Sequence, residues 1–408
     1  MVRWIAIGLL IILAVVRYGM WQSAPLELRE GMKVRVRMRI GGEIRQAWGR
    51  SFWSQSYGNQ EVEVEVPQGV EYGDEIWAEG KLEKSVTEAD YTKWRLNYTM
   101  IKVNKGVGLT GGLRQWREIM IQKMLMWLPG DEGALAAGIL LGGSGALSKS
   151  GTEAFRKSGL LHIVAASGYN VSVVAGWAMA VGAKIWGRRR VILFVLLCII
   201  TYVIVAGAGP AVVRAGIMGG LVWLGMAWGR KGDPGWLLVI ASLIMVIIRP
   251  IWFTDIGFQL SVAATAGLIW VLPMIRRLKI IRIKSWAWFE EGLWVTVAAQ
   301  IATLPLLAHY FGQVSAVAPV VNALVLWAVP WSMQLTAAAV GVGMLFPAAG
   351  QAIAWLAWPL LRYMTGVVSW SAGWPGAGGV VGKMGWGWVI GYYLVIIMII
   401  LKGNLKFK

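Results

Sequence analysis

The chain has 408 residues, 57% of them hydrophobic, and a mean hydropathy of +0.60. This composition is typical of a polytopic membrane protein and excludes an ordinary soluble domain. A single cysteine, Cys198, excludes an intramolecular disulfide, and two histidines are too few for an ordinary histidine-rich metal site.

The net charge of +18 is unevenly distributed along the chain. Residues 26–108 contain 13 Lys/Arg and 13 Asp/Glu, so the rest of the chain contributes the whole excess. Most of this excess lies in short segments between hydrophobic stretches, where basic residues mark the cytoplasmic side of a membrane protein. Membrane topology therefore explains the charge better than nucleic-acid binding does.

The first predicted element is a hydrophobic helix over Trp4–Trp21. A cleaved signal peptide is the alternative, because the apolar core Trp4–Val16 has a suitable length. No small-x-small cleavage site follows at a suitable distance, and Pro25 lies close to the end of the segment. We therefore expect an uncleaved transmembrane anchor over residues 1–25.

Residues 26–108 have the pattern of a β-domain. Strict alternation of polar and apolar residues over Lys33–Ile40 and Glu61–Val66 predicts half-buried strands, and two further strands are expected at 73–82 and 97–103. About five short strands separated by turns predict a small barrel, and the OB-fold is the obvious candidate.

Two interpretations of the basic strand remain open. In the first, it binds DNA through basic side chains and aromatic stacking platforms. The candidate contacts are Lys33, Arg35, Arg37, Arg39, Trp48, Phe52 and Trp53. In the second, cross-strand ion pairs join it to the strand that carries Glu61, Glu63 and Glu65.

Residues 109–158 are predicted to contain an interfacial helix and a small-residue helix. Leu113–Leu128 is amphipathic and too short to cross a bilayer. Asp131–Gly143 is rich in small residues and has two acids in its first turn, where the helix dipole favours them. The following GGSGALSKS resembles a P-loop, but Ser148 replaces the glycine before Lys149 and no strand precedes it, so we reject nucleotide binding.

Hydrophobic stretches near the length that crosses a bilayer follow from residue 159 to the end. They are 160–184, 191–208, 211–229, 235–249, 255–274, 287–308, 316–343, 350–371 and 384–401. With the anchor they make about ten transmembrane helices, so residues 159–408 form a multi-helix membrane domain. The predicted fold class is an α-helical polytopic membrane protein with an inserted OB-like β-barrel domain.

The basic residues between these stretches predict one orientation. They cluster in alternate loops, at Arg188–Arg190, at Arg230 and Lys231, between Arg276 and Lys284, and after Lys402. Because cytoplasmic loops carry an excess of Lys and Arg, we expect both termini in the cytoplasm and residues 22–158 outside it.

Polar residues inside the predicted spans are the candidate site, because each is costly in lipid unless it meets water or a partner. The stretch Ser158–Gly176 contains several of them and a stripe of small residues at four-residue spacing, which lets another helix approach. The candidate lining residues of a polar path are His162, Ser167, Gly168, Asn170, Arg214, Asp255, Gln259 and Ser261. An alternative makes Arg214 and Asp255 an architectural ion pair.

The segment GLLHIVAASGYNV resembles the signature of the ComEC-type competence proteins, close to G-L-x-H-L-L-A-x-S-G-x-[HN]-V. The matching residues are Gly159, Leu160, His162, Ala165, Ser167, Gly168, Asn170 and Val171. Tyr169 and Asn170 stand where many members have Leu-His, so this sequence lacks the second histidine of those members. The resemblance extends over roughly residues 26–345, through Asp131–Gly168, the Pro210–Ala215 segment, Asp255–Ser261 and Gln300–Asn322.

The resemblance implies a channel that passes single-stranded DNA into the cytoplasm during natural transformation, with an external OB-like domain. It implies no catalytic activity and no cofactor; the partners are DNA, the bilayer, a DNA receptor outside and a helicase-type motor or single-strand-binding protein inside. Many members end in a metallo-β-lactamase-like domain with an HxHxDH motif, which this sequence lacks, so we expect no nuclease on it. The alternatives are a secondary transporter or lipid-intermediate flippase, and a membrane enzyme that uses His162 and Asp255.

Overall fold

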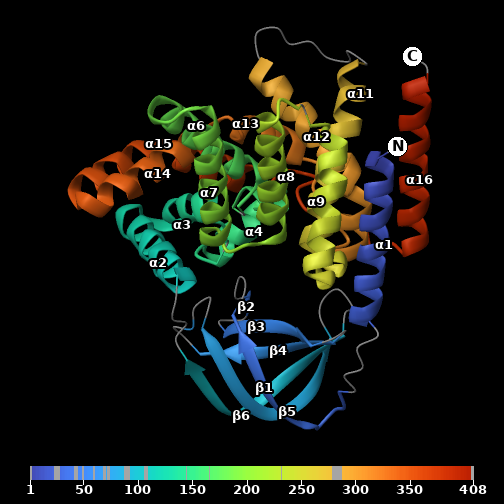
Figure 1. Cartoon of the computed structure of the whole chain (residues 1–408). Coiled ribbons are helices and arrows are strands. Elements are labelled where there is room, and N and C mark those ends of the chain that lie inside the picture. The colour runs from blue at the N-terminus through green and yellow to red at the C-terminus, as the bar shows by residue number, and fades with distance from the viewer. Residues whose placement is uncertain are drawn as a thin grey trace. The chain divides into compact units, whose positions relative to one another are not determined.

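The computed structural model describes residues 2–22, 28–40, 45–47, 50–57, 60–67, 70, 74–86, 92–104, 109–143, 145–164, 166–230, 232–277 and 287–405. The chain forms two compact units. The first comprises Met1–Ile119, Val174–Lys231 and Val239–Asp255; the second comprises Met120–Val173, Gly232–Leu238 and Ile256–Lys408. Figure 1 shows the elements of both units.

The first unit contains a six-stranded mixed sheet. Its strands are β1 (Lys33–Arg39), β2 (Arg45–Ala47), β3 (Arg50–Tyr57), β4 (Gln60–Val66), β5 (Glu75–Val86) and β6 (Thr92–Asn104). Their order is β1-β5-β6-β4-β3-β2, and β4 and β6 form the parallel pair. In this order β1 and β2 are the two edges, so closure into a barrel stays a prediction.

Alternation along the strands determines which face of the sheet is buried. Val36, Met38, Val62, Val64 and Ile76 point into one apolar core, whereas the basic residues of β1 lie on the other face. The register shifts between Glu79 and Gly80, where a Cβ at residue 80 would lie 2.2 Å from the Asn97 carbonyl oxygen. Glycine is therefore required at this bulge.

The pairing of β1 corrects one interpretation of the sequence. The basic strand lies beside β5, with Arg35 opposite Glu79 and Arg39 opposite Glu75. The strand that carries Glu61, Glu63 and Glu65 is β4, which pairs with β3 and β6. The ion ladder predicted between β1 and β4 is therefore wrong, because alternation identifies the faces of a strand but not its neighbour.

The first unit also contains apolar helices. They are α1 (Val2–Gln22), the later part of α6 (Gly168–Ile185), α7 (Arg188–Val205), α8 (Pro210–Ala227), most of α9 (Pro234–Ile248) and the short η1 (Pro250–Thr254). Helices α7 and α8 pack closely at Gly216, where a Cβ would lie 2.7 Å from a methyl of Val203. Small residues allow this approach between apolar helices.

The second unit is helical apart from a two-stranded sheet. Its helices are the end of α2 (Leu109–Trp127), α3 (Gly130–Leu141), α4 (Lys149–Lys157), α5 (Leu161–Val164), α10 (Ile256–Ala266), α11 (Leu272–Arg277), α12 (Ala287–Tyr310), α13 (Ala318–Val325), α14 (Ala328–Leu345), α15 (Pro347–Ser371) and α16 (Trp386–Leu405). A π-helical segment, η2 (Gly267–Val271), joins α10 to α11. The small sheet pairs β7 (Gln313–Val314) with β8 (Gly379–Val380).

Several described helices are suited to a membrane. By length and composition, 5 can cross a bilayer: Leu161–Ile185, Pro210–Ala227, Ile256–Arg277, Phe289–Tyr310 and Ala328–Leu345. Shorter apolar helices cover Ile7–Met20, Arg190–Val205, Pro234–Ile248 and Trp386–Lys402. The protein is thus a multi-pass membrane protein, and the full set of about ten spans stays a prediction.

Two predicted spans are interrupted. The span 160–184 consists of α5 and α6, and the span 316–343 consists of α13 and most of α14. Interrupted helices occur at membrane depth only where protein or a water-lined cavity surrounds the free backbone groups. The first interruption lies within the stretch that the sequence singles out.

Candidate functional site

The stretch Ser158–Gly176 begins with a buried turn. Ser158 is fully buried, and Gly159 has a positive φ of 78°. A Cβ at Gly159 would lie 2.7 Å from that of Ala318, so α13 packs directly on the turn. Both the φ angle and this close contact require glycine here.

Asn170 holds the start of α6 against α3. It is 2% exposed, and its Nδ2 donates a 2.6 Å hydrogen bond to the carbonyl oxygen of Ile139. Ser167 Oγ donates to Asn170 Oδ1 at 3.3 Å. The structure thus brings these two predicted residues together, and the contact with α3 satisfies a carbonyl near the end of that helix.

His162 and the small-residue stripe are more exposed. The His162 side chain is exposed, with Nδ1 3.1 Å from the Gly159 carbonyl oxygen. Ser172 Oγ donates to the Gly168 carbonyl within α6 itself. A Cβ at Gly176 would meet nothing within 4 Å, so no described residue packs closely at this end of the stripe.

Gln259 is tied to an aromatic cluster at the end of α12. Its Oε1 accepts a 2.9 Å hydrogen bond from the Tyr310 hydroxyl. The ring of His309 lies 4.3 Å from that of Trp386, and its Nδ1 donates to the Met384 carbonyl oxygen at 2.6 Å. Ser261, on the same helix as Gln259, is half-buried. These contacts connect α10, α12 and α16.

Arg214 and Asp255 belong to the first unit, and the other six predicted path residues to the second. Helix α8 begins at Pro210 as predicted, and Arg214, one turn later, is 8% exposed. Asp255 directly precedes α10. An ion pair between the two and a common water-filled path for all eight residues stay predictions.

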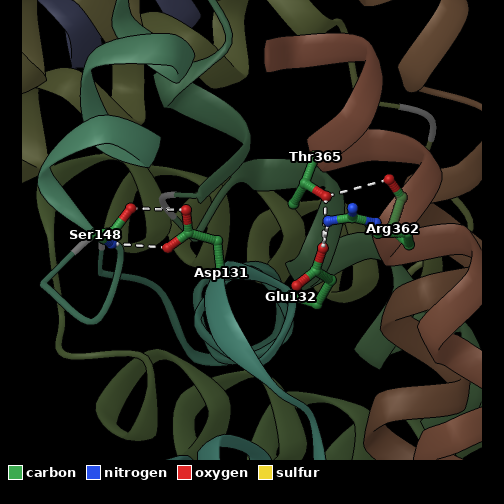
Figure 2. Close-up of polar contacts among 5 residues, drawn as sticks. All are labelled: Asp131, Glu132, Ser148, Arg362 and Thr365. Atoms are coloured by element: carbon green, nitrogen blue, oxygen red, sulfur yellow. Dashed lines mark hydrogen bonds and ion pairs between the residues drawn. The ribbon is translucent and has the colours of Figure 1, made fainter.

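Two neighbouring acids at the start of α3 form contacts that the sequence did not reveal (Figure 2). The Asp131 carboxylate accepts hydrogen bonds from the backbone N and the Oγ of Ser148, both at 2.8 Å. Ser148 Oγ in turn accepts from Gly151 N at 2.9 Å and caps α4. Asp131 therefore positions α4 relative to α3.

Glu132 connects α3 to α15 (Figure 2). Its Oε1 accepts from Arg362 Nη1 at 3.0 Å and from Thr365 Oγ1 at 2.9 Å. The partners lie more than 200 residues further along the chain, so local patterns do not predict the contact. The spacing of Arg362 and Thr365, three residues apart, shows that they share one face of α15, but it does not identify Glu132 as their partner.

The basic face of the sheet is partly neutralised by β5. Arg35 donates to Glu79 Oε2 through Nε and Nη2, at 2.9 and 2.7 Å. Arg37 is hydrogen-bonded to Glu75, and this bond together with the carboxylate charge raises the pKa of Arg37. The basic residues of β1 thus form cross-strand ion pairs, but with acids of β5 and not with the predicted acids of β4.

The other predicted DNA contacts differ in accessibility. Lys33 is exposed, Trp53 is half-buried, and Phe52 is 4% exposed under the guanidinium of Arg95. Phe52 lies opposite Glu65, on the face away from the apolar core, and is covered there, so it is not an exposed stacking platform, whereas Trp53 packs against the core. Trp48 and the side chain of Arg39 lie outside the described residues. In the part of the chain that is described, no three His, Cys, Asp or Glu residues gather as a metal site requires.

Comparisons with known proteins give one consistent family. A family model described as Competence protein matches residues 139–406. ComE operon protein 3 of Bacillus subtilis (strain 168) is 24% identical over 198 residues, which are 48% of this chain and 25% of that protein. Competence protein ComA of Neisseria gonorrhoeae is 30% identical over 277 residues, 62% of this chain and 37% of that protein. The matches thus cover well under half of each relative, and no solved structure matches.

Proposed function

The chain belongs to the competence protein family, and from this premise we propose that it is a membrane channel that imports single-stranded DNA into the cytoplasm during natural transformation. The observation that carries the proposal is the family match over residues 139–406, more than half of the chain. This region contains most of the apolar helices and the stretch Ser158–Gly176.

The physical requirements of a DNA channel support the proposal. A polyanion crosses lipid only along a wide, water-filled path, and fixed acids on this path would repel it. The chain outside residues 26–108 contains 26 Lys/Arg but 8 Asp/Glu. Of the few acids there, Asp131 and Glu132 are each engaged by a protein partner. The path residues proposed from the sequence are uncharged apart from Arg214 and Asp255.

We propose that residues 26–108 form an external OB-like domain that contacts the DNA. The strand order β1-β5-β6-β4-β3, with its one parallel pair, supports a barrel that closes between β1 and the β2–β3 hairpin. Both termini are proposed to be cytoplasmic. A separate receptor outside and a helicase-type motor or single-strand-binding protein inside complete the import process.

Uptake of fluorescent DNA tests the channel directly. Cells with and without the gene receive labelled duplex, external DNA is digested with nuclease, and protected fluorescence and transformants are counted. We expect both to disappear without the gene, to return with the wild-type chain, and to persist when DNA enters by electroporation. Unchanged protected fluorescence overturns the proposal, and loss of a small solute's transport instead favours the transporter alternative.

A further inference from the structure

The exposed face of the sheet carries a row of three side chains from adjacent strands. Strand register places Arg37 of β1 opposite Trp77 of β5, and Trp77 opposite Lys102 of β6. Residues directly opposite each other in neighbouring strands point to the same face. The row therefore consists of an indole flanked by a cation on each side.

All three side chains of this row are accessible. The Trp77 residue is 36% exposed, the Arg37 side chain is 62% exposed, and Lys102 is exposed as well. The guanidinium carbon of Arg37 lies 5.0 Å from the centre of the Trp77 ring. Carboxylates of the adjacent rows, Glu75 and Glu79, are bound by Arg37 and Arg35.

Glu75 holds the row in one arrangement. One of its oxygens accepts the Arg37 Nε–H, and the other accepts the Trp77 indole N–H at 3.4 Å. A single carboxylate thus orients both the guanidinium and the indole. Its charge also offsets that of Arg37, so the row binds anions less strongly than two unpaired cations would.

We infer that this row, Arg37–Trp77–Lys102, is a binding site for one nucleotide of a single strand, in which a base stacks on Trp77 and its flanking phosphates contact Arg37 and Lys102. Two strand spacings separate the backbones of Arg37 and Lys102 by roughly 10 Å, with Trp77 between them. An exposed aromatic ring binds any unstacked base, and flanking cations bind any phosphate, so the site has no sequence preference.

The inference rests on the proposed function, because the cargo of a DNA channel is the single strand that this row would meet. It replaces the buried Phe52 with Trp77 as the stacking residue. It also assigns Glu75 a role: the acid weakens each phosphate contact, and weak binding lets a strand move on.

The test uses the purified full-length chain in detergent and a fluorescent oligo-dT, with the dissociation constant measured by anisotropy across a salt series. Trp77→Ala should weaken binding by about 5- to 150-fold, the range expected for one lost stack. Trp77→Tyr should restore most of it. A duplex, whose bases are already stacked, should bind Trp77→Ala and the wild type equally.

Two charge variants make the test independent of Trp77. Lys102→Gln should weaken binding and reduce the slope of log K against log salt by about 0.7, the value for one phosphate of a single strand. Glu75→Gln should bind more tightly and increase the slope by about 0.7, a gain that loss of structure does not produce. Lys84→Gln is the matched control. Lys84 is exposed and lies on β5, like Trp77 and Glu75, but the alternation of the strand places it on the opposite face of the sheet.

Wild-type affinity in a folded Trp77→Ala protein, or unchanged slopes in both charge variants, overturns the inference. If uptake is lost without the gene but the three variants bind normally, the channel proposal stands and this site fails. If cells without the gene take up DNA normally, the channel proposal fails whatever the oligonucleotide results are.

Discussion

At the scale of single residues, buried polar side chains in this protein are held by specific partners. Asn170 donates to a carbonyl of α3, and Glu132 accepts from Arg362 and Thr365. Such bonds are expected wherever a polar group leaves water, since an unsatisfied group costs about 1–3 kcal/mol. These residues therefore connect helices.

The Glu132–Arg362 ion pair is asymmetric, and this predicts unequal effects of mutation. The side chain of Glu132 is 8% exposed, whereas that of Arg362 is 66% exposed. Arg362→Ala leaves a buried carboxylate without its cation and should lower the free energy of unfolding by about 1–3 kcal/mol. Glu132→Gln should cost less, because the amide still accepts from Thr365 and Arg362 can turn to solvent.

Chemical unfolding of the purified protein in detergent measures both effects. Arg156→Ala is the control, because its ion pair with Glu153 is largely exposed and worth less than about 1 kcal/mol. A Glu132→Gln protein that is less stable than Arg362→Ala would show that burial of the carboxylate is not the dominant factor.

At the scale of elements, close helix packing occurs at glycines other than those of the predicted stripe. A Cβ added at Gly176, in the predicted stripe, would meet no atom within 4 Å. Helices α14 and α15, in contrast, pack closely and lie side by side in Figure 1. A Cβ at Gly350 would lie 2.3 Å from the Cα of Gly343. Small residues along a sequence show where helices can approach, and only the fold selects the place where they do.

Gly350→Leu should therefore disrupt the α14–α15 hairpin. The added side chain would overlap with backbone atoms of α14. Overpacking of this kind lowers the free energy of unfolding by about 1–3 kcal/mol or more. Gly341→Leu is the matched control, because a Cβ there meets nothing within 4 Å. Thermal unfolding and the yield of folded protein measure the difference, and equal behaviour of the two variants would contradict the close packing.

At the scale of the whole molecule, the positions of the basic loops predict one orientation in the membrane. The single cysteine makes this testable, since Cys198→Ser removes every thiol from the chain. Met100→Cys in this background places a thiol on the sheet, at a residue that is 66% exposed. Lys402→Cys places one at the end of α16.

A membrane-impermeant maleimide should label the Met100→Cys protein in intact cells. The Lys402→Cys protein should react only after permeabilisation, because its thiol is expected in the cytoplasm. Labelling of Lys402→Cys in intact cells would contradict the proposed cytoplasmic position of the C-terminus. It would not affect the fold described for each unit.

The sequence by itself determined the features that depend on local periodicity. The alternation of polar and apolar residues predicted the strands observed at Lys33–Arg39 and Gln60–Val66 and the face that each buries. The lengths of the apolar stretches predicted most of the helices. The motif around Ser158–Gly176 was sufficient to identify the family, because residue types at set spacings are read directly from the chain.

The tertiary structure alone decided which segments are neighbours. It paired β1 with β5 and so gave Arg35 and Arg37 the partners Glu79 and Glu75, which lie 44 and 38 residues further along the chain, instead of the acids of β4. It likewise joined Glu132 to Arg362 and placed Trp77 between two cations. The physical reason is that periodicity specifies the buried face of each element, whereas packing of all the faces together selects the partner that covers it.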